Sequence, residues 1–482
     1  MQHSQVKNIM ALPEAQTTLS NWSKTGHSPC YHIAARDVAD IQEALAVARA
    51  QQLTVIPHGA GHSYTDAALN TGGIVLDLTP MNRILAWDAG QGIMRVEPGV
   101  TLRDMLRASW KDGWWPFATP STPEVTIGGC VAMNVMGKNA WKDGAFGDHV
   151  LALDVLLASG ETMTLTPQGD AQLFRAFVGG VGLLGVITAI TMQLQRLPSG
   201  RVTIQRRAAA SLAGIFTLFS ELRQESDFIE AWLDGFAEGG QLGRGHVTAA
   251  TMTHTAGKPQ FRFPSPGLRD QLAVSFTRRF GGLYRPLFLT SIPIANHIKY
   301  WQGRWEGRKP QQRSLLPYTY YSPAAFAGYH VMLPQGVETF QAFVSGQQAQ
   351  TDFADVLRYS QQHGYTPIWC IIKQHRRDPS LLSYQLDGFS LELNYPRTAR
   401  RSRGGKTLED VLRQMIEMVV AAGGRFYLAK DHFMTAEQYR RSIGAETVDT
   451  FLDLKRRYDP EAVFQSDLFQ RLFQPAPQQQ GG

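Results

Sequence analysis

The 482-residue chain has only three cysteines, Cys30, Cys130 and Cys370, and they lie far apart in the sequence. No CxxC pair and no HExxH motif is present, so we expect neither a disulfide framework nor one of the common zinc sites. The chain also lacks an uninterrupted apolar run of the ~18 to 20 residues that a membrane span requires. Its first residues, MQHSQVKNIMALPEAQ, do not have the pattern of a secretory signal peptide. These absences favour a soluble cytoplasmic protein.

Charge of one sign is not concentrated strongly anywhere in the sequence. The net charge is +6, and the lysines and arginines are spread over many positions. A nucleic-acid-binding protein usually has a clustered basic patch or a recognition motif, so we expect no nucleic-acid partner. Hydrophobic residues make up 43% of the chain and charged residues 18%, which is typical of a globular protein. The length predicts two domains.

The first 200 residues alternate between helical and strand-like patterns. Residues 37–52 place apolar side chains at helical spacing, and 101–113 begin with capping residues and end at Gly113. Residues 150–166 predict a hairpin that turns at Ser159 and Gly160. Strands and helices mixed in this way favour an α+β fold.

Beyond residue 201 two irregular stretches interrupt the pattern. Residues 253–270 and 296–318 are predicted to be long mobile loops, which in a compact domain are often lids. The second stretch contains several basic residues among Tyr300, Trp301 and Trp305. It could contact a phosphate or a membrane surface, or it could simply be a solvated loop.

Two glycine-rich segments contain parts of a GxGxxG pattern. The letters GVGLLG at 180–185 match it fully, but a predicted helix precedes them and a predicted strand follows them. A Rossmann fingerprint has the opposite order, so that a helix begins at the glycines. The segment TVIPHGAGHSYT at 54–65 has only Gly59 and Gly61, and another strand follows it. Neither segment therefore predicts a Rossmann site.

A third segment suggests why so many glycines are present. TPSTPEVTIGGCVAMNVMGKN at 119–139 combines hydroxyl side chains with Gly128 and Gly129 and with the polar residues Asn134, Lys138 and Asn139. Glycine lets backbone N–H groups approach an anion closely. Together with the glycines at 59–61 and 179–185, this segment predicts a cradle for a large dinucleotide.

These segments resemble a known flavoenzyme family. PHGAGHSYTDAALNTGGIVLDLTPMNRIL, PSTPEVTIGGCVAMNVMGKN, GAFGDHV and FVGGVGLLGVIT are similar to the flavin domain (PCMH type) of the vanillyl-alcohol oxidase superfamily. AWLDGFAEGGQLGRG, GGRFYLAKD and YDPEAVFQSDLFQRL resemble the decaprenylphosphoryl-ribose oxidases within it. The resemblance implies FAD as the cofactor and a two-domain α+β fold. We expect an FAD-binding domain at 1–200, a substrate domain at 201–414, and a C-terminal segment at 415–482 that returns to the flavin.

The resemblance also gives His62 a role. In many covalent members of the superfamily a histidine after the glycine pair bonds the 8α-methyl carbon of the flavin, and His62 occupies that place. The decaprenylphosphoryl-ribose oxidases lack this histidine and hold FAD non-covalently. The GHS sequence at 61–63 is instead typical of aldonolactone and alditol oxidases. A covalent bond through His62 is therefore expected, the alternative being a histidine that only lies near the flavin.

Other residues fall on the family's FAD-contacting segments. The positions that the resemblance implies for FAD binding are Gly59, Ala60, Gly61, His62, Ser63, Tyr64, Thr119, Ser121, Thr122, Thr126, Gly128, Gly129, Cys130, Asn134, Gly137, Lys138, Asn139, Ile187 and Tyr427.

The resemblance further implies a set of catalytic residues. Lys430 matches a lysine beside the isoalloxazine ring, and Lys373 matches a substrate-facing lysine. Tyr329 and His330 fall where the decaprenylphosphoryl-ribose oxidases have a tyrosine and a polar contact. Glu392 stands where these enzymes have a cysteine. Either Glu392 or His330 could take a proton from a substrate hydroxyl, and alternation in FSLELNY places Ser390, Glu392 and Asn394 on one face.

The expected activity is FAD-dependent oxidation of a CH–OH group in a sugar or polyol-like small molecule, which could carry a phosphate or a lipid. Molecular oxygen or another acceptor would reoxidise the flavin, and peripheral membrane contact is possible. The alternatives are a peroxide-producing aldonolactone or alditol oxidase and a flavin-binding protein without catalysis.

Overall fold

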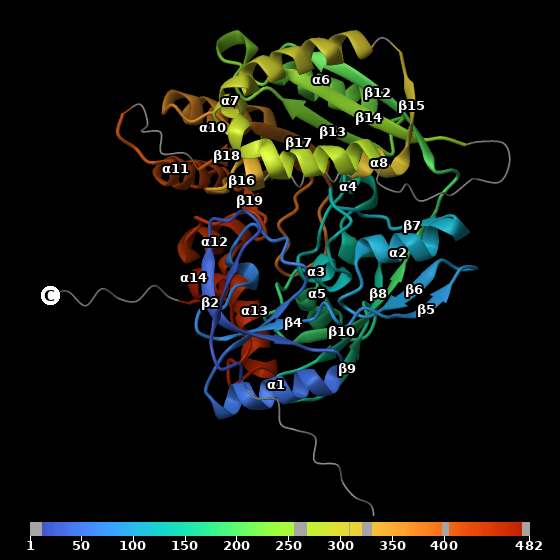
Figure 1. The fold of residues 1–482 in the computed structure, drawn as a ribbon, viewed down its shortest axis with the longest axis vertical. Coiled ribbons are helices and arrows are strands. Elements are labelled where there is room, and N and C mark those ends of the chain that lie inside the picture. Colours follow the sequence, from blue (N-terminus) through green and yellow to red (C-terminus); the bar gives the residue numbers. More distant parts are fainter. Residues whose placement is uncertain (1–11, 255–267, 308, 321–329, 398–403, 475–482) are drawn as a thin grey trace, which may run out of the picture.

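The computed structural model describes residues 12–254, 268–307, 309–320, 330–397 and 404–474. Within these residues, helices are mixed with strands that form four sheets. Figure 1 shows the largest sheet in the upper half of the molecule and two smaller sheets in the lower half. The mixture of helices and strands agrees with the predicted α+β class.

A small sheet near the N-terminus has the strand order β1-β2-β4-β3, with β2, β4 and β3 parallel. Its strands are β1 (Thr17–Ser20), β2 (His27–Ala34), β3 (Val55–His58) and β4 (Ile74–Asp77). Helix α1 (Val38–Ala50) connects β2 to β3, and the Asp37 side chain caps it by accepting a hydrogen bond from the Asp40 N–H. The helix predicted over 37–52 is confirmed. The first glycine loop follows the carboxyl end of β3.

A second, antiparallel sheet has the order β5-β6-β10-β8-β9. Its strands are β5 (Ile84–Asp88), β6 (Ile93–Val96), β8 (Val150–Leu156), β9 (Thr162–Leu165) and β10 (Val186–Gln193). The hairpin β8–β9 is confirmed, and Gly160 in its turn has φ +89°, which favours glycine. Helix α5 (Ala171–Phe177) precedes the GVGLLG glycines and β10 follows them. This order confirms that GVGLLG is not a Rossmann fingerprint.

Short elements lie between β6 and β8 of the second sheet and after its strand β10. Helix α2 is capped by Thr101, and the chain turns after it at Gly113, as predicted. These elements are α2 (Leu102–Ser109), β7 (Trp114–Trp115), α3 (Ile127–Ala132), α4 (Ala140–Asp143) and β11 (Gln195–Arg196).

The largest sheet is antiparallel, with the order β15-β12-β14-β13-β17-β18-β16-β19. Its strands are β12 (Arg201–Ala209), β13 (Phe228–Leu233), β14 (Gly245–Met252), β15 (Gln311–Ser314), β16 (Val337–Ser345), β17 (Trp369–His375), β18 (Gly388–Pro396) and β19 (Arg425–Phe426). The helices beside it are α6 (Leu212–Arg223), α7 (Leu268–Glu306), α8 (Leu315–Thr319), α10 (Ala349–Gln362) and α11 (Leu408–Ala421).

The two faces of this sheet have different neighbours. Phe389 of β18 contacts Phe216 and Phe219 of α6, so α6 covers one face. Strand pairing places Glu392 of β18 and Trp232 of β13 on the other face, because both are in register with Ile371. Lys299 of α7 lies over the Trp232 ring there, at 4.2 Å from its centroid. Helix α7 and the polar side chains of β18 therefore share one face.

The structure corrects the prediction of a long loop over 296–318. Residues 296–306 belong to α7, and residues 311–319 form β15 and α8. The sequence of α7 contains glycine at 281 and 282 and proline at 286 and 293. These residues disfavour the interior of a helix, so a long helix is difficult to predict here. Of the other predicted loop, 253–270, residues 255–267 lie outside the described residues and 268–270 begin α7.

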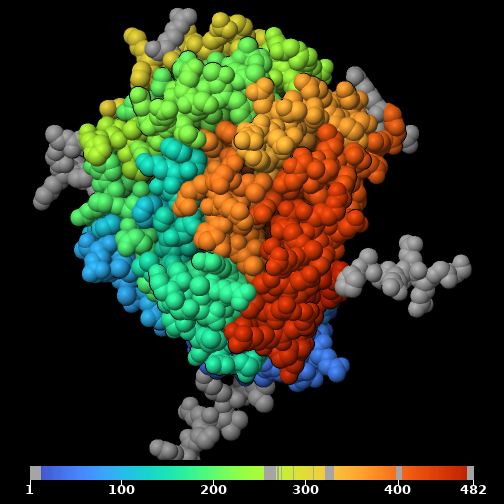
Figure 2. Space-filling model, turned by 180° about the vertical axis from the view of Figure 1, so that it is seen from behind, coloured from blue at the N-terminus to red at the C-terminus, as the bar shows by residue number. Residues whose placement is uncertain are grey.

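The C-terminal helices return to the part of the chain that contains the two smaller sheets. They are α12 (Ala436–Ile443), α13 (Ala445–Tyr458) and α14 (Asp467–Phe473). The Val55 N–H of β3 donates to the Val463 carbonyl at 2.7 Å, and Asp467 accepts hydrogen bonds from Thr71. Figure 2 shows the C-terminal residues, in red, against segments from both the N-terminal and the middle parts of the chain. In the described part of the chain, no helix combines the length and the apolar character needed to cross a bilayer.

Candidate active site

A cavity of about 320 Å³ lies where the glycine loops meet the largest sheet. Its walls come from segments that are far apart in the sequence, between residues 57 and 68, 120 and 136, 181 and 187, 369 and 373, and 427 and 430. Gln341 of β16, Glu392 and Asn394 of β18, and the single residues Trp22, Leu78 and Pro98 complete it. The site thus joins the carboxyl end of β3 to the polar face of the largest sheet.

The first two glycine segments touch each other at the cavity wall. A Cβ atom on Gly59 would collide with Oγ1 of Thr126, and one on Gly128 would lie 2.7 Å from Cβ of Pro98. Gly61 has φ +66°, a conformation that side chains disfavour. Within the described residues, the backbone N–H groups of Ala60, Gly61 and His62 donate to no acceptor. These groups suit the binding of an anion such as a pyrophosphate.

The third glycine turn also reaches the cavity. Val181, Gly182 and Gly185 line it; Gly182 has φ +76°, and a Cβ atom added there would lie 3.4 Å from Cδ of Pro57. On the opposite side, Oε1 of the buried Gln341 has no hydrogen-bond partner in the described structure, so this oxygen is available to a bound molecule. Close glycine contacts, free N–H groups and an unpaired buried amide all fit a dinucleotide such as FAD.

Lys430 and Glu392 form a largely buried ion pair in the cavity wall. Nζ of Lys430 lies 2.8 Å from Oε1 of Glu392 and 4.0 Å from the centre of the Tyr64 ring. Nδ2 of Asn394 donates to the same oxygen at 3.3 Å. Within the described residues, Oε2 of Glu392 accepts no hydrogen bond and is left for a ligand.

Electrostatics keep this pair ionised although it is buried. Burial alone would raise the pKa of Glu392, but Lys430 and Lys373 hold it below its ordinary value. Burial likewise disfavours the Lys430 cation, yet Glu392 and Tyr64 keep the pKa of Lys430 above its ordinary value. Glu392 is the only carboxylic acid among the lining residues of the described structure.

A second ion pair lies behind the first. Nζ of Lys138 is 2.9 Å from Oε1 of Glu230 and also donates to the Tyr318 carbonyl at 2.9 Å. Glu230 is opposite Lys373 in the pairing of β13 with β17. Burial lowers the pKa of Lys373, and the cations Lys430 and Lys138 lower it further against the opposing effect of Glu392 and Glu230. Lysines and glutamates therefore alternate from Lys138 and Glu230 behind the cavity wall to Lys373, Glu392 and Lys430 within it.

The predicted histidines lie at the other end of the site. The ring of Trp22 stacks on His62 with 4.4 Å between centroids, and its edge contacts His330 at 4.8 Å. His62 lines the cavity, whereas His330 does not. Burial lowers the pKa of both histidines. Tyr329 lies outside the described residues.

The other predicted residues divide into two groups. Those that line the cavity are Lys430, Lys373, Glu392, Gly59, Ala60, Gly61, His62, Ser63, Tyr64, Ser121, Thr122, Thr126, Gly128, Gly129, Cys130, Ile187 and Tyr427. Those that do not are Thr119, Asn134, Gly137, Lys138 and Asn139. Asn134, for example, accepts a hydrogen bond from the Gly147 N–H and donates to Asp378 at 3.0 Å, which ties two loops together.

Sequence reasoning missed several lining residues, among them Trp22, His58, Gln341, Trp369 and Ile371. Gln341 is opposite Glu392 in the pairing of β16 with β18. No local pattern reveals that pairing. Asn394 was visible in the alternation of FSLELNY but was not assigned to the site.

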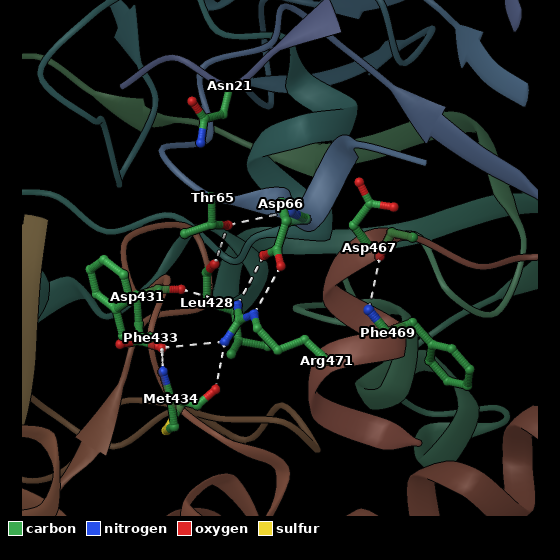
Figure 3. A network of polar contacts seen from close by, with 12 residues as sticks. Asn21, Thr65, Asp66, Leu428, Asp431, Phe433, Met434, Asp467, Phe469 and Arg471 are labelled. Carbon is green, nitrogen blue, oxygen red and sulfur yellow. Dashed lines mark hydrogen bonds and ion pairs between the residues drawn. The ribbon is translucent and has the colours of Figure 1, made fainter. Parts of the chain in front are cut away.

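A network centred on Arg471 fixes the loops that carry His62 and Lys430 (Figure 3). Arg471 of α14 makes a bidentate ion pair with Asp66, at 2.8 and 2.9 Å, and donates to the Met434 carbonyl at 2.7 Å. Close by, the Thr65 hydroxyl donates to the Leu428 carbonyl at 2.7 Å. The loop after the first glycine segment is thereby joined to the segment that holds Lys430.

Comparison with known proteins agrees with this site. Residues 29–166 match a family model described as an FAD binding domain. The chain is 27% identical to decaprenylphosphoryl-beta-D-ribose oxidase of Mycolicibacterium smegmatis over 95% of this chain and 98% of that protein. It is 32% identical to mouse L-gulonolactone oxidase and 31% identical to glycolate oxidase subunit GlcD of Bacillus subtilis, over 36% of this chain and 39% and 38% of those proteins. The matched segment is an FAD binding domain, so the cofactor of this protein is FAD and the chain is an FAD-dependent oxidoreductase.

Proposed function

We propose that the protein oxidises a CH–OH group of a sugar or polyol-like substrate. The observation that carries the proposal is that the Glu392 carboxylate and two lysines line the same cavity as the glycine cradle. A proton acceptor is thus available beside the cofactor site. The related proteins named for ribose and gulonolactone oxidation support a substrate of this class.

When bound, FAD supplies the hydride acceptor, at its N5 atom. Glu392 accepts the proton of the substrate hydroxyl on Oε2, because Lys430 and Asn394 already occupy Oε1. Lys373 donates a hydrogen bond to the substrate oxygen and thereby orients it. Trp369 and Ile371 cover the neighbouring wall with apolar surface, which keeps water away from the reacting carbon. His330 is less suited to act as the base because it packs on Trp22 outside the cavity lining.

An aldonolactone or alditol oxidase that reduces oxygen to peroxide is the second candidate. The GHS sequence at 61–63 and the position of His62 in the cavity wall favour it. A flavin-binding protein without catalysis is a further alternative. The carboxylate of Glu392 in the cavity lining, with its Oε2 atom unbonded, argues against this alternative, because binding of FAD alone does not require a proton acceptor there.

One experiment separates the three functions. The purified holoenzyme is mixed without oxygen with a panel of pentoses, aldonolactones, alditols and polyprenyl-phosphate sugars, and the flavin absorbance is recorded. Bleaching by at least one CH–OH compound supports the proposal, and peroxide release in air after bleaching by an alditol or lactone supports the second candidate. If no compound bleaches the flavin although dithionite does, the proposal is wrong.

Replacing Glu392 by glutamine should slow flavin reduction about 100- to 10,000-fold, because the hydroxyl proton loses its acceptor. The wild-type rate should stay constant down to pH values at which an ordinary glutamate is already protonated, because the pKa of Glu392 is lowered. The acid limb below that range should be absent in Glu392→Gln. Stopped-flow absorbance under substrate saturation measures both.

Glu338→Gln is the matched control for this change. Glu338 is a buried, ion-paired glutamate in the adjacent strand β16, but strand alternation places it on the opposite face, and it does not line the cavity. Its replacement should leave the rate of flavin reduction unchanged. A similar loss of rate in both variants, or a wild-type inflection near neutral pH, would contradict the role of Glu392.

A covalent bond between His62 and the flavin is also proposed. Acid precipitation of the wild-type protein should leave the yellow colour in the pellet, and His62→Ala should release it into the supernatant. His58→Ala is the control, since His58 also lines the cavity and lies four residues earlier. A colourless wild-type pellet, or a yellow His62→Ala pellet, would contradict the attachment.

The division of the chain is part of the same proposal. We place the FAD-binding domain at 1–200, the substrate domain at 201–414 and the returning segment at 415–482. The position of Tyr427, Ala429 and Lys430 in the cavity wall supports the return of the last segment to the flavin.

A further inference from the structure

Helix α7 exposes a row of large apolar side chains along its whole length. Leu283 is 75% exposed, Trp305 72%, Leu287 66% and Ile294 65%. Exposed leucines and tryptophans are normally scattered singly over a protein surface. The other members of this outer face are Leu268, Leu272, Phe276, Phe280, Tyr284, Ile298 and Trp301.

The outer face is continuous because its residues recur at helical spacing. The intervals of three and four in 280, 283, 287 and again in 294, 298, 301, 305 keep these side chains on one side of α7. The opposite side packs on the protein. Ile292, Asn296 and Tyr300 are buried there, and Asn296 donates to Asp234 at 3.1 Å. Helix α7 is thus apolar on two sides, and only one of them is covered.

Basic side chains flank the outer face. The Arg279 guanidinium lies 5.9 Å from the ring centre of Phe280, and that of Arg304 lies 5.4 Å from the ring centre of Trp301. Among the α7 side chains that the structure describes, the only acidic one is Glu306, and Arg206 pairs with it at 2.6 Å. The flank of the outer face is therefore positively charged.

Helix α7 also lies beside the active-site cavity. Phe288, Leu289 and Ile292 form an apolar cluster with Ile368 and with Tyr64, and Tyr64 lines the cavity. A surface that holds the outer face of α7 would consequently be close to the site where substrate binds.

We propose that the outer face of α7 binds the surface of an anionic lipid bilayer, with the helix lying in the plane of the interface. Leucine, phenylalanine and tryptophan on one face of a 39-residue helix, with arginine at its edge, is the pattern of an interfacial helix. A second copy of the chain fits less well, because two such faces would bring arginines of one sign together without acidic partners. The binding is independent of the reaction proposed above.

The test is flotation of the FAD-loaded protein with vesicles of equal parts phosphatidylglycerol and phosphatidylcholine. The protein should float with these vesicles, and far less with phosphatidylcholine alone or in high salt. The triple variant Leu283→Gln, Leu287→Gln, Ile294→Gln should bind about 10-fold more weakly or worse, because three apolar side chains no longer enter the interface. Arg279→Gln with Arg304→Gln should weaken binding and reduce its dependence on salt.

The matched control replaces exposed apolar residues elsewhere. Ile84, Leu85 and Leu151 are 37 to 43% exposed on β5 and β8, and their change to glutamine should leave flotation unchanged. Visible absorbance of the flavin and far-ultraviolet circular dichroism establish that each variant is folded. Equal flotation of the wild type and the triple variant, or no flotation at all, would overturn the proposal. So would a dimer in light scattering that the triple variant abolishes while lipid binding is absent.

Discussion

Replacing Lys430 by methionine should slow reduction of the bound flavin by substrate about 100- to 1,000-fold, which is the effect of removing one preorganised charge at a reacting centre. Lys430 is the cation that pairs with Glu392 at 2.8 Å inside the cavity. Without it, the buried carboxylate loses its main compensation, and the pKa of Glu392 should rise. The acid limb of the pH profile should therefore move to higher pH as the rate falls. Stopped-flow absorbance at several pH values measures both effects.

Two further variants make this result interpretable. Removing one partner of a buried ion pair can destabilise a protein by about 3–5 kcal/mol, so a slow Lys430→Met protein could simply be misfolded. The double variant with Glu392→Gln removes both charges, which should restore stability but not the rate. Lys142→Met removes a lysine that pairs with Asp227 at 2.6 Å outside the cavity lining, and its rate should equal that of the wild type. A near-wild-type rate for Lys430→Met would exclude Lys430 from the reacting centre.

Local features of the fold could be predicted because their signals are local. The cap of α1 at Asp37, the hairpin at Gly160 and the order of helix, glycines and strand around 180–185 each depend on a few neighbouring residues. The part of α7 after residue 296 was not predicted because glycine and proline at 281, 282, 286 and 293 interrupt the sequence before it. These residues locally favour the end of a helix, whereas the continuation of α7 depends on its packing against the largest sheet.

The residues of the site could be predicted only where a motif or a resemblance identified them. Lys373, Glu392 and Lys430 come from three segments, and no pattern within the sequence shows that β17, β18 and the chain after β19 meet. Gln341 was missed for this reason, since its place opposite Glu392 depends on the pairing of two strands about fifty residues apart. Lys138 and Asn134 carry the right chemistry for a ligand, but the structure uses them to hold Glu230 and Asp378.

Replacing Arg471 by alanine should lower the free energy of unfolding by about 3–5 kcal/mol and weaken retention of FAD. The reason is that Asp66 and Asp431, both buried, would lose the guanidinium that lies 2.8 Å and 3.7 Å from their carboxylates. Burial already raises the pKa of Asp431 to about 6, with Arg471 lowering it, so the loss of Arg471 should raise that pKa further. Urea titration of the holoprotein, followed by circular dichroism and by release of flavin fluorescence, measures both effects.

The control is Arg440→Ala, which removes an arginine–aspartate pair on the surface. Arg440 of α12 contacts both oxygens of Asp449 at 2.9 and 3.0 Å, but both side chains are exposed, so the expected loss is about 0–1 kcal/mol. The double variant Arg471→Ala with Asp66→Asn should regain part of the stability, because one uncompensated buried charge is gone. It should not regain FAD retention. The loop after Tyr64 and the segment around Lys430 would still lack the Arg471 contacts that join them to α14. If Arg471→Ala lowers the free energy of unfolding no more than Arg440→Ala does, the contacts of Arg471 in Figure 3 do not stabilise the attachment of the loop after Tyr64 to α14.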